Sequence, residues 1–261
     1  MKVLVIGDIV GRPGREAVAT FVPQLRREFT LDWVIANAEN AAGGSGVTQN
    51  IAAELFATGI DVLTTGNHIW SKPEIFPILD SDHRILRPAN YPKTSPGVGA
   101  ATYAGKNGTT FGVANVMGRV FMDVCDCPFA TATACVEELR KTTPLIFVDM
   151  HAEATSEKVA MGWFLDGQVS CVFGTHTHIP TADERVLPGG TAYITDLGMT
   201  GPYDSVIGRN KEQIIKRFVT HMPVKFEMAE HDVQLRGALI EVDPQTGKAL
   251  AIERVTRKLG T

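Results

Sequence analysis

Two histidines, His176 and His178, stand two positions apart after an apolar run at residues 169–173. Such a run is typical of a buried strand, so both imidazoles are expected where a strand ends. In α/β folds, sites are built at that edge of the sheet. Neutral imidazole is also the commonest side-chain ligand of metal ions. The pair alone is weak support for a metal site, because surface histidines reach this spacing by chance.

Four further apolar, strand-like runs also end in polar side chains that can bind a metal ion. The ends of neighbouring strands in one sheet meet within side-chain reach, so we expect these groups to share one cleft. The predicted ligands are Asp8 after residues 2–7, Glu39 and Asn40 after 33–38, Asn67 after 61–65, His151 after 145–150, and His176 and His178.

The number of these ligands indicates two metal ions. Two carboxylates and three imidazoles exceed what one tetrahedral zinc ion takes. Buried together without cations, the carboxylates would repel and raise each other's pKa. Two cations roughly 3.5–4 Å apart would use all the ligands, with Glu39 or Asp8 as the bridge. The amide oxygens of Asn40 and Asn67 would complete the coordination, and this mixed oxygen and nitrogen set suits iron, manganese, zinc or cobalt.

Each of these residues also has an ordinary structural reading. A carboxylate or an asparagine after a strand often forms a turn or caps a helix, and a single His151 can be a hydrogen-bonded core residue. The joint pattern is harder to explain in this way, because four of the seven histidines fall in these segments. The other three, His83, His221 and His231, lack that context and are predicted to be surface or structural residues.

Length and composition favour one α/β domain spanning residues 1–261, with 44% hydrophobic residues for its core. The net charge of −4 argues against a long nucleic acid as partner. No apolar run approaches the roughly 20 residues of a membrane helix, and the N-terminal residues lack a signal-peptide pattern. The four cysteines form no CxxC pair, which indicates reduced thiols and a cytoplasmic location. Cys125 and Cys127 are a weaker candidate for a thiolate site.

The predicted elements alternate between strand and helix and end in an antiparallel hairpin, which favours a sheet-on-sheet core covered by helices. Residues 87–99, rich in proline and turn formers, are predicted to be a long surface connection. The predicted strands are residues 2–7, 33–38, 61–65, 111–116, 145–150, 169–173, 191–195, 237–242 and 249–255. The predicted helices are residues 13–28, 48–58 with Thr48 as N-cap, 72–79 with Ser71 as cap, 136–141, 157–165 and 211–220.

Three motifs within residues 7–178 resemble those of the calcineurin-like metallophosphoesterases, in the same order. Four positions depart from the superfamily pattern. Val10 and Ile69 stand where a histidine and an acidic residue are usual, Glu39 replaces the bridging aspartate, and Asn40 replaces an imidazole. The motifs are Gly7-Asp8, Gly66-Asn67-His68 and Gly174-Thr175-His176-Thr177-His178.

With these departures the chain is similar to the bacterial YmdB-like phosphodiesterases, in residues 7–15, 38–44, 66–70 and 149–153. The resemblance implies a four-layer αββα fold, two divalent or trivalent ions of iron or manganese, and hydrolysis of 2′,3′-cyclic nucleotides to nucleoside monophosphates. A hydroxide between the ions would attack phosphorus, and His68 would protonate the leaving oxygen or else orient a ligand. The resemblance assigns Asp8, Glu39, Asn40 and His178 to one ion, and Glu39, Asn67, His151 and His176 to the other.

Other functions remain open at this point. Residues 7–14 follow a strand and open a helix, as a dinucleotide loop does, but the spacing G-x3-G-x2-G does not match that fingerprint. A regulatory or scaffolding protein with a retained metal site is one alternative, and an enzyme acting on another phosphoester is a second. Residues 117–129 are predicted to form a substrate lid, a subunit contact or packing under a loop. A homo-oligomer is expected on general grounds.

Overall fold

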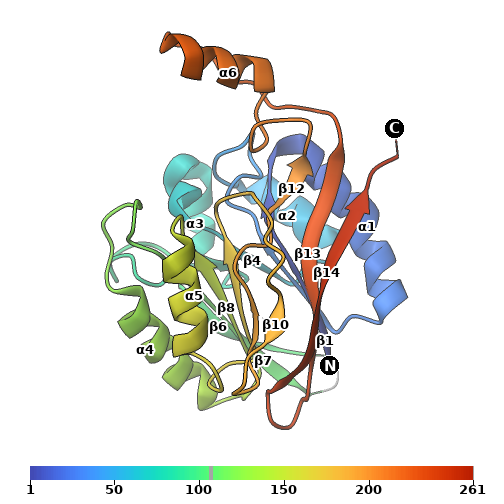
Figure 1. The fold of residues 1–261 in the computed structure, drawn as a ribbon. Helices are drawn as coiled ribbons and strands as arrows, with labels where there is room; N and C mark the ends of the chain where they lie inside the picture. The colour runs from blue at the N-terminus through green and yellow to red at the C-terminus, as the bar shows by residue number, and fades with distance from the viewer. Residues whose placement is uncertain (106–107, 261) are drawn as a thin grey trace.

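The computed structural model describes residues 1–105 and 108–260, and two β-sheets lie face to face in it (Figure 1). The strands of the first sheet are β1 (Lys2–Ile6), β2 (Asp8–Ile9), β3 (Trp33–Asn37), β4 (Val62–Thr64), β5 (Ile85–Leu86), β12 (Met199–Pro202), β13 (Val233–Val242) and β14 (Ala249–Lys258). Those of the second are β6 (Ala100–Ala104), β7 (Thr110–Met117), β8 (Ile146–His151), β9 (Cys171–Thr175), β10 (Arg185–Val186) and β11 (Ala192–Ile194).

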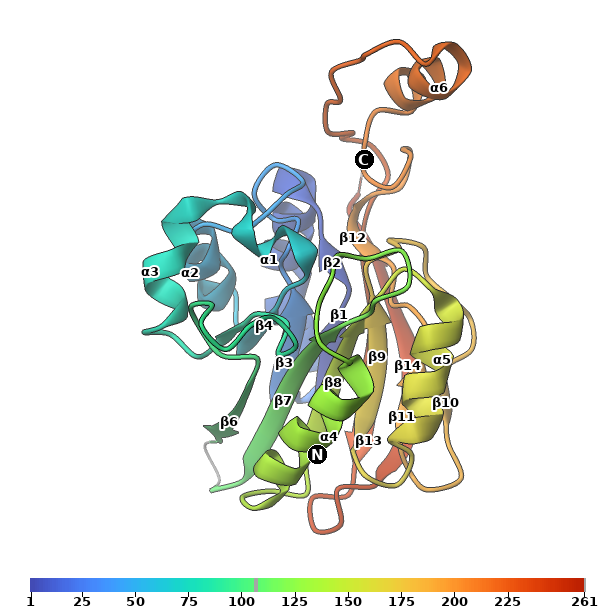
Figure 2. The same ribbon diagram turned by 90° about the vertical axis from the view of Figure 1, so that its left-hand side faces the viewer.

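Helices cover the outer face of each sheet (Figures 1 and 2). The first sheet is covered by α1 (Gly11–Phe29), α2 (Gln49–Ala57) and α3 (Phe76–Leu79), and α3 is preceded by the 3₁₀ turns η1 (Asn67–Ser71) and η2 (Pro73–Ile75). The second sheet is covered by α4 (Pro128–Arg140) and α5 (Thr155–Phe164). A last helix, α6 (Lys211–Thr220), stands away from both layers.

Side chains that alternate along the strands build three buried cores between these four layers. In β1, Val3 and Val5 face the second sheet, whereas Leu4 and Ile6 face α1 and α2. A third core lies between the second sheet and α4 and α5. The four-layer αββα arrangement predicted from the sequence is therefore confirmed.

The strand order places the ligand-bearing segments at one end of the molecule. The order β2–β12–β13–β1–β3–β4–β5 makes β1, β3, β4 and β5 parallel neighbours, with β14 paired to β13. The second sheet runs β10–β11–β9–β8–β7–β6, and β7, β8, β9 and β11 are parallel. Buried polar groups join the two sheets where these strands end, because Nδ2 of Asn37 donates to Oδ2 of Asp149 over 3.1 Å.

Most predicted elements match the structure, including the Thr48 cap, helix 211–220 and the terminal hairpin. The prediction that Ser71 caps a helix is wrong, because Ser71 is the last residue of η1 and only 76–79 are α-helical. Helix α4 begins at Pro128, not at 136, since its buried face there is formed by small residues such as Ala132 that give a weak apolar pattern.

The connection 87–99 lacks regular structure, as predicted, although Arg87 and Asn90 at its start are buried. His83, His221 and His231 are not buried, which agrees with their predicted surface position. Within the described ranges, no helix has both the length and the apolar character needed to cross a bilayer.

Candidate metal centre

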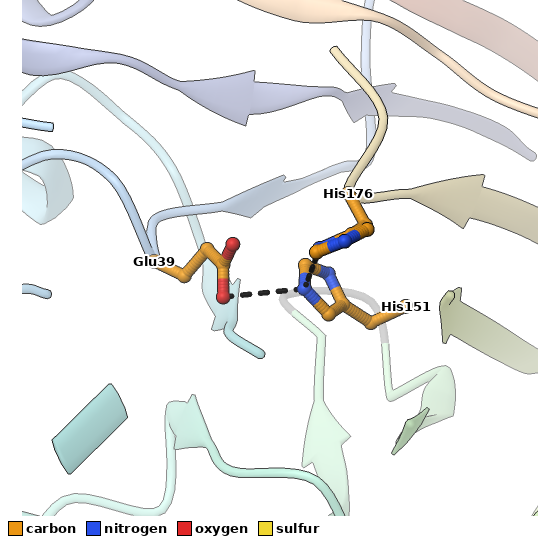
Figure 3. Close-up of side chains that lie close together, drawn as sticks. All are labelled: Glu39, His151 and His176. Carbon is orange, nitrogen blue, oxygen red and sulfur yellow. Dashed lines mark hydrogen bonds and ion pairs between the residues drawn. The ribbon is translucent and has the colours of Figure 1, made fainter. Parts of the chain in front are cut away.

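Three of the predicted ligands form a compact cluster between the two sheets (Figure 3). Glu39 follows β3 of the first sheet, His151 ends β8 of the second, and His176 directly follows β9. Each offers a ligand atom, and these atoms all lie within 4.8 Å of one another. The two imidazole rings meet edge to face at an interplanar angle of 78°, and Nδ1 of His176 lies 3.1 Å from Nε2 of His151.

The other four predicted ligands adjoin this cluster. Oδ1 of Asn67 lies 3.2 Å from Nε2 of His151. Both carboxylate oxygens of Asp8 accept from the backbone N–H of His176 at 3.2 Å. Nε2 of His178 lies 3.1 Å from Oδ1 of Asn40 and 4.0 Å from Oδ1 of Asp8. The structure thus brings all seven predicted ligands together.

Asp8 is also the first residue of a short strand, β2, which pairs with β12. At the adjoining start of α1, the backbone N–H of Gly11 donates to the carbonyl of Asn40 over 3.0 Å. In a dinucleotide loop this N–H would point toward the pyrophosphate. Here it donates within the chain, which argues against a dinucleotide site at residues 7–14. Cys125 and Cys127, the weaker candidates, belong to no group of three or more metal-binding side chains in the described part of the chain.

The hydrogen bonds of His151 fix which nitrogen carries its proton. The Thr175 hydroxyl donates to Oδ1 of Asp149 over 2.7 Å, which uses its only proton. The same hydroxyl oxygen lies 2.9 Å from Nδ1 of His151, so it accepts from that nitrogen. Nδ1 therefore carries the proton, and Nε2 turns a lone pair toward the cluster.

The same reasoning applies to the other two histidines. Nε2 of His176 lies 3.2 Å from a carboxylate oxygen of Glu153, which only accepts, so the free lone pair is on Nδ1. Nδ1 of His178 donates to the carbonyl of Ile207 over 3.1 Å, which leaves a lone pair on Nε2. Partners outside the cluster thus orient all three imidazoles with an unprotonated nitrogen facing inward, as metal-ligating histidines require.

With the protons placed in this way, hydrogen-bond acceptor atoms of neighbouring side chains face one another across the cluster. Nε2 of His151 faces Oε2 of Glu39 at 3.2 Å, Oδ1 of Asn67 at 3.2 Å and Nδ1 of His176 at 3.1 Å. Such contacts are repulsive unless a cation lies among them. A Cβ at Gly66 would lie 2.1 Å from Nε2 of His151, so only glycine leaves this space open. The donor set therefore fits metal ions.

Without metal, a proton takes the place of the cation. Burial opposes a charge on His151, but the Glu39 carboxylate raises the pKa of His151 to about 9. Burial would raise the pKa of Glu39, yet the imidazoles of His151 and His68 hold it well below its usual range. Burial and the positive His151 lower the pKa of His176 to about 3. Burial raises the pKa of Asp8 to about 6.

A buried ion pair between Lys158 and Asp196 supports the loop that carries His176 and His178. Nζ of Lys158 contacts Oδ2 of Asp196 at 2.6 Å, and both side chains are almost fully enclosed. The same carboxylate oxygen accepts from the hydroxyl of Thr177 over 2.8 Å. Both histidines have left-handed backbones, with φ of 97° and 66°. This conformation is unfavourable for residues other than glycine, and the hydrogen bond of Thr177 to Asp196 helps to hold the loop in it.

His68 lies at the open side of the cluster, and its side chain is 39% exposed. Its Nδ1 is 3.1 Å from Nδ2 of Asn40, which can only donate, and 3.6 Å from Oε1 of Glu39. The carboxylate raises the pKa of His68. In the neutral ring Nδ1 accepts from Asn40, and in the charged ring both nitrogens are protonated. In both states Nε2 carries a proton.

Arg209 and Ile207 brace the other side of the cluster. The carbonyl of Ile207 holds His178, and the guanidinium of Arg209 donates to the carbonyls of Gly43 and Gly44 at 3.3 and 3.2 Å. The carbonyl of Gly44 also accepts from Nδ2 of Asn40 over 3.2 Å. The segment that leads into α6 is thus bonded to the surroundings of two predicted ligands.

The groups that orient the ligands were not predicted from the sequence. One signal for them was present, because Asp149 interrupts the apolar run 145–150 and a buried carboxylate needs partners. Nothing in the local pattern pointed to Lys158 or Arg209, which lie far along the chain from the ligands that they support. The missed residues are Asn37, Asp149, Glu153, Lys158, Thr175, Asp196, Ile207 and Arg209.

Comparison with known proteins decides the family. The model of the family described as "YmdB-like protein" matches residues 4–255. The chain belongs to the YmdB-like family. One YmdB-like relative, a 2′,3′-cyclic-nucleotide 2′-phosphodiesterase from Bacillus subtilis (strain 168), is 51% identical over 255 residues, which are 98% of this chain and 96% of the relative.

Two solved structures also match this YmdB-like chain over nearly its whole length. A hypothetical protein from Thermus thermophilus superposes with a TM-score of 0.92 at 39% identity and covers 99% of both chains. A protein described as a novel phosphatase from Mycoplasma pneumoniae superposes with a TM-score of 0.92 at 34% identity, over 99% of this chain and 93% of the other. The YmdB-like fold identified here is thus the fold of these solved relatives.

Proposed function

We propose that this protein hydrolyses 2′,3′-cyclic nucleotides with the help of two bound metal ions. The observation that carries the proposal is the inward-facing cluster of acceptor atoms, which can be stable only around positive charge. The full-length similarity to the Bacillus subtilis 2′,3′-cyclic-nucleotide 2′-phosphodiesterase supports the substrate. As in that relative, the bond from phosphorus to the 2′-oxygen would break, which leaves a nucleoside 3′-monophosphate.

Contacts of His178 join it to Asn40 and Asp8, and contacts of His151 join it to Glu39, Asn67 and His176. Glu39, which precedes Asn40 in the chain, is the proposed bridge between the two groups. The mixed donors suit iron or manganese, and such ions lower the pKa of coordinated water and offset charge on phosphoryl oxygens. Asp8, Glu39, Asn40 and His178 would hold one ion, and Glu39, Asn67, His151 and His176 the other.

His68 is the proposed general acid. Its Nε2 carries a proton in both ionisation states and lies on the exposed side of the cluster, where substrate would arrive. As water adds to phosphorus and the bond to the 2′-oxygen breaks, the Nε2 proton would pass to that oxygen. The contact with Asn40 fixes the ring, so the acid is oriented before the substrate binds. General acids of this kind contribute about 10²–10⁴-fold to the rate.

The test is a hydrolysis assay on protein purified without chelator, with 2′,3′-cyclic AMP, 3′,5′-cyclic AMP and a chromogenic diester and monoester. We expect opening of the 2′,3′ ring, formation of the 3′-monophosphate and loss of turnover after chelation. His68→Ala should keep two metals per chain while kcat falls about 10²–10⁴-fold, and Asp8→Asn should lose metal. His83→Ala, at a histidine on the surface, is the matched control and should behave as wild type.

Two results would contradict the proposal. Protein with two metals per chain that opens no 2′,3′ ring is not this enzyme, and full activity of His68→Ala removes that residue as the acid. Since the Mycoplasma pneumoniae relative is described as a phosphatase, a phosphomonoester is the second candidate substrate. Faster turnover of the monoester than of any diester would favour that second candidate.

A further inference from the structure

Phe121 holds an aromatic ring in solvent on the segment that connects β7 with α4. It belongs to residues 119–126, called the rim loop here. The residue is 88% exposed, and its backbone is left-handed, with φ of 62°. This conformation is unfavourable for a residue with a Cβ atom, and an exposed ring adds little packing in return. Backbone strain that packing does not offset is typical of functional residues.

The rim loop begins next to one of the predicted metal ligands. Met117, the last residue of β7, is the register partner of His151 on β8. The backbone N–H of Gly118 donates to the carbonyl of His151 over 2.9 Å, and Phe121 follows three residues later. Figure 2 shows the loop in green at the end of the molecule where β7 and β8 end. The ring of Phe121 is therefore held close to the proposed metal centre.

Hydrogen bonds to the body of the molecule fix both ends of the rim loop. At its start, the backbone N–H of Arg119 donates to the two carboxylate oxygens of Glu157 at 3.0 and 3.1 Å. At its end, the side chain of Asn90, which is 1% exposed, donates to the carbonyl of Asp126 over 3.0 Å. The exposed ring thus sits on an anchored loop, which reduces the entropy lost when a ligand binds.

Two more aromatic side chains connect the rim loop with the surroundings of the general acid. Trp70 follows His68 by two residues, and its ring meets that of Tyr91 edge to face, with centroids 5.5 Å apart. The hydroxyl of Tyr91 contacts Sδ of Met117 at 3.7 Å. Burial and the Asp123 carboxylate raise the pKa of Tyr91 to about 12. Aromatic side chains therefore extend from the vicinity of His68 to the rim loop.

The charges of the rim loop indicate which part of a substrate fits it. The loop carries two carboxylates, Asp123 and Asp126, and one cation, Arg119. None of the three forms an ion pair within residues 1–105 and 108–260. A loop with an excess of negative charge repels a phosphate group. A nucleobase is neutral, and it offers a π face to an aromatic ring and N–H groups to carboxylates.

We propose that the rim loop is the base-binding subsite of this protein, with the base of the 2′,3′-cyclic nucleotide stacked on Phe121. The proposal rests on the function proposed above, because the base reaches the loop only when the cyclic phosphate is held at the metal centre. Every base has a π face, so stacking accepts all four bases and selects nucleotides over cyclic phosphates that have no base. Phe121 determines this specificity through binding, and the reaction itself takes place at the metals and His68.

The test compares initial rates on 2′,3′-cyclic AMP and on glycerol 1,2-cyclic phosphate, which keeps the reacting ring and has no base. Wild type should prefer the nucleotide. Phe121→Ala should lower kcat/KM for the nucleotide roughly 5–150-fold, mainly through KM, which corresponds to the loss of one base–aromatic stack. It should leave the rate on the glycerol ester unchanged. Phe121→Trp should keep the preference, whereas Phe121→Leu, which has no π face, should lose it.

Trp163→Ala is the matched aromatic control. Trp163 is 52% exposed near the C-terminal end of α5, away from the rim loop, so both rates should stay at wild-type values. Turnover of both esters with equal kcat/KM in wild type and Phe121→Ala overturns the base subsite and leaves the proposed function standing. Metal-loaded wild type that hydrolyses neither ester overturns both proposals together.

Urea unfolding separates a binding role of the ring from a structural one. Phe121→Ala should keep the wild-type midpoint, because the ring is exposed. Phe121→Gly should unfold at a higher urea concentration than Phe121→Ala, since glycine adopts the left-handed conformation without steric cost, and it should lose the preference for the nucleotide. A Phe121→Ala midpoint well below that of wild type would show that the ring stabilises the fold, and would overturn the argument from strain.

Discussion

Replacing Gly66 by alanine should empty the metal centre of a folded protein. The φ of Gly66 is −156°, outside the left-handed region, so the effect of alanine follows from the space that its Cβ would need. That Cβ would lie 2.1 Å from Nε2 of His151 and 2.3 Å from Oε2 of Glu39, each more than 1 Å short of the 3.4 Å at which ordinary contact begins. The methyl group therefore occupies the space between the two ligands.

The size of the effect follows from how little a metal site can move. Ligand distances tolerate changes of about 0.2 Å, and a displacement near 1 Å in an active site costs about 10²-fold in rate. We expect Gly66→Ala to lose bound metal and at least about 10²-fold in turnover, while the circular dichroism spectrum stays native. Mass spectrometry measures the metal content, and initial rates on 2′,3′-cyclic AMP measure the turnover.

Gly43→Ala is the control, because at Gly43 the backbone would be strained while the space for a Cβ is free, whereas at Gly66 that space is filled. A Cβ there meets nothing within 4 Å, but φ is +67°, so the backbone is strained while the space is free. The left-handed conformation costs roughly 1–2 kcal/mol in a residue other than glycine, which lowers the unfolding midpoint and leaves metal in place. Gly66→Ala protein with two metals and wild-type rates would refute the argument from crowding.

Three further outcomes are expected. Thr175→Val removes the acceptor of the His151 Nδ1 proton and should weaken metal binding about 10–100-fold, measured by competition with a fluorescent chelator. Thr175→Ser keeps the hydroxyl and should bind metal as wild type does, so equal affinity of the two variants would contradict this role. Lys158→Met leaves the buried Asp196 carboxylate without its cation and should cost about 3–5 kcal/mol in urea unfolding, whereas Lys141→Met, in an exposed pair, should cost almost nothing. Because the pKa of His151 is raised from 6.5 to about 9, chelated protein should lose unfolding free energy as pH rises through that window; a flat or rising profile of urea midpoints would show that His151 carries no proton.

The strands that carry the predicted ligands could be read from the sequence because each is a short apolar run followed by a polar group. The hydrophobic pattern gave their bounds to within one or two residues, and the convergence of strand ends followed from parallel order. Strands such as β2 and β5, each two residues long, are too short for any periodicity to appear. The metal-binding roles, the acid role of His68 and the single domain stay predictions.

The groups that orient the imidazoles could not be predicted in the same way. The role of Thr175 depends on a proton that it gives to Asp149, and that contact joins residues from two strands. The sequence also did not show that α6 stands away from the rest of the molecule, although the bounds of this helix were predicted correctly. The spacing of apolar residues along a ten-residue helix is the same whether that face packs on the core of its own chain or on another molecule.

The place of β1 in the first sheet affects how the chain can be made. Strand β1 pairs on one side with β3, which follows soon after it in the chain, and on the other with β13, which begins only at Val233. Until the hairpin of β13 and β14 emerges, one edge of β1 stays open in the middle of the future sheet. We therefore expect nascent chains that stop before residue 233 to expose an unpaired strand edge and to depend on chaperones until β13 and β14 have been made.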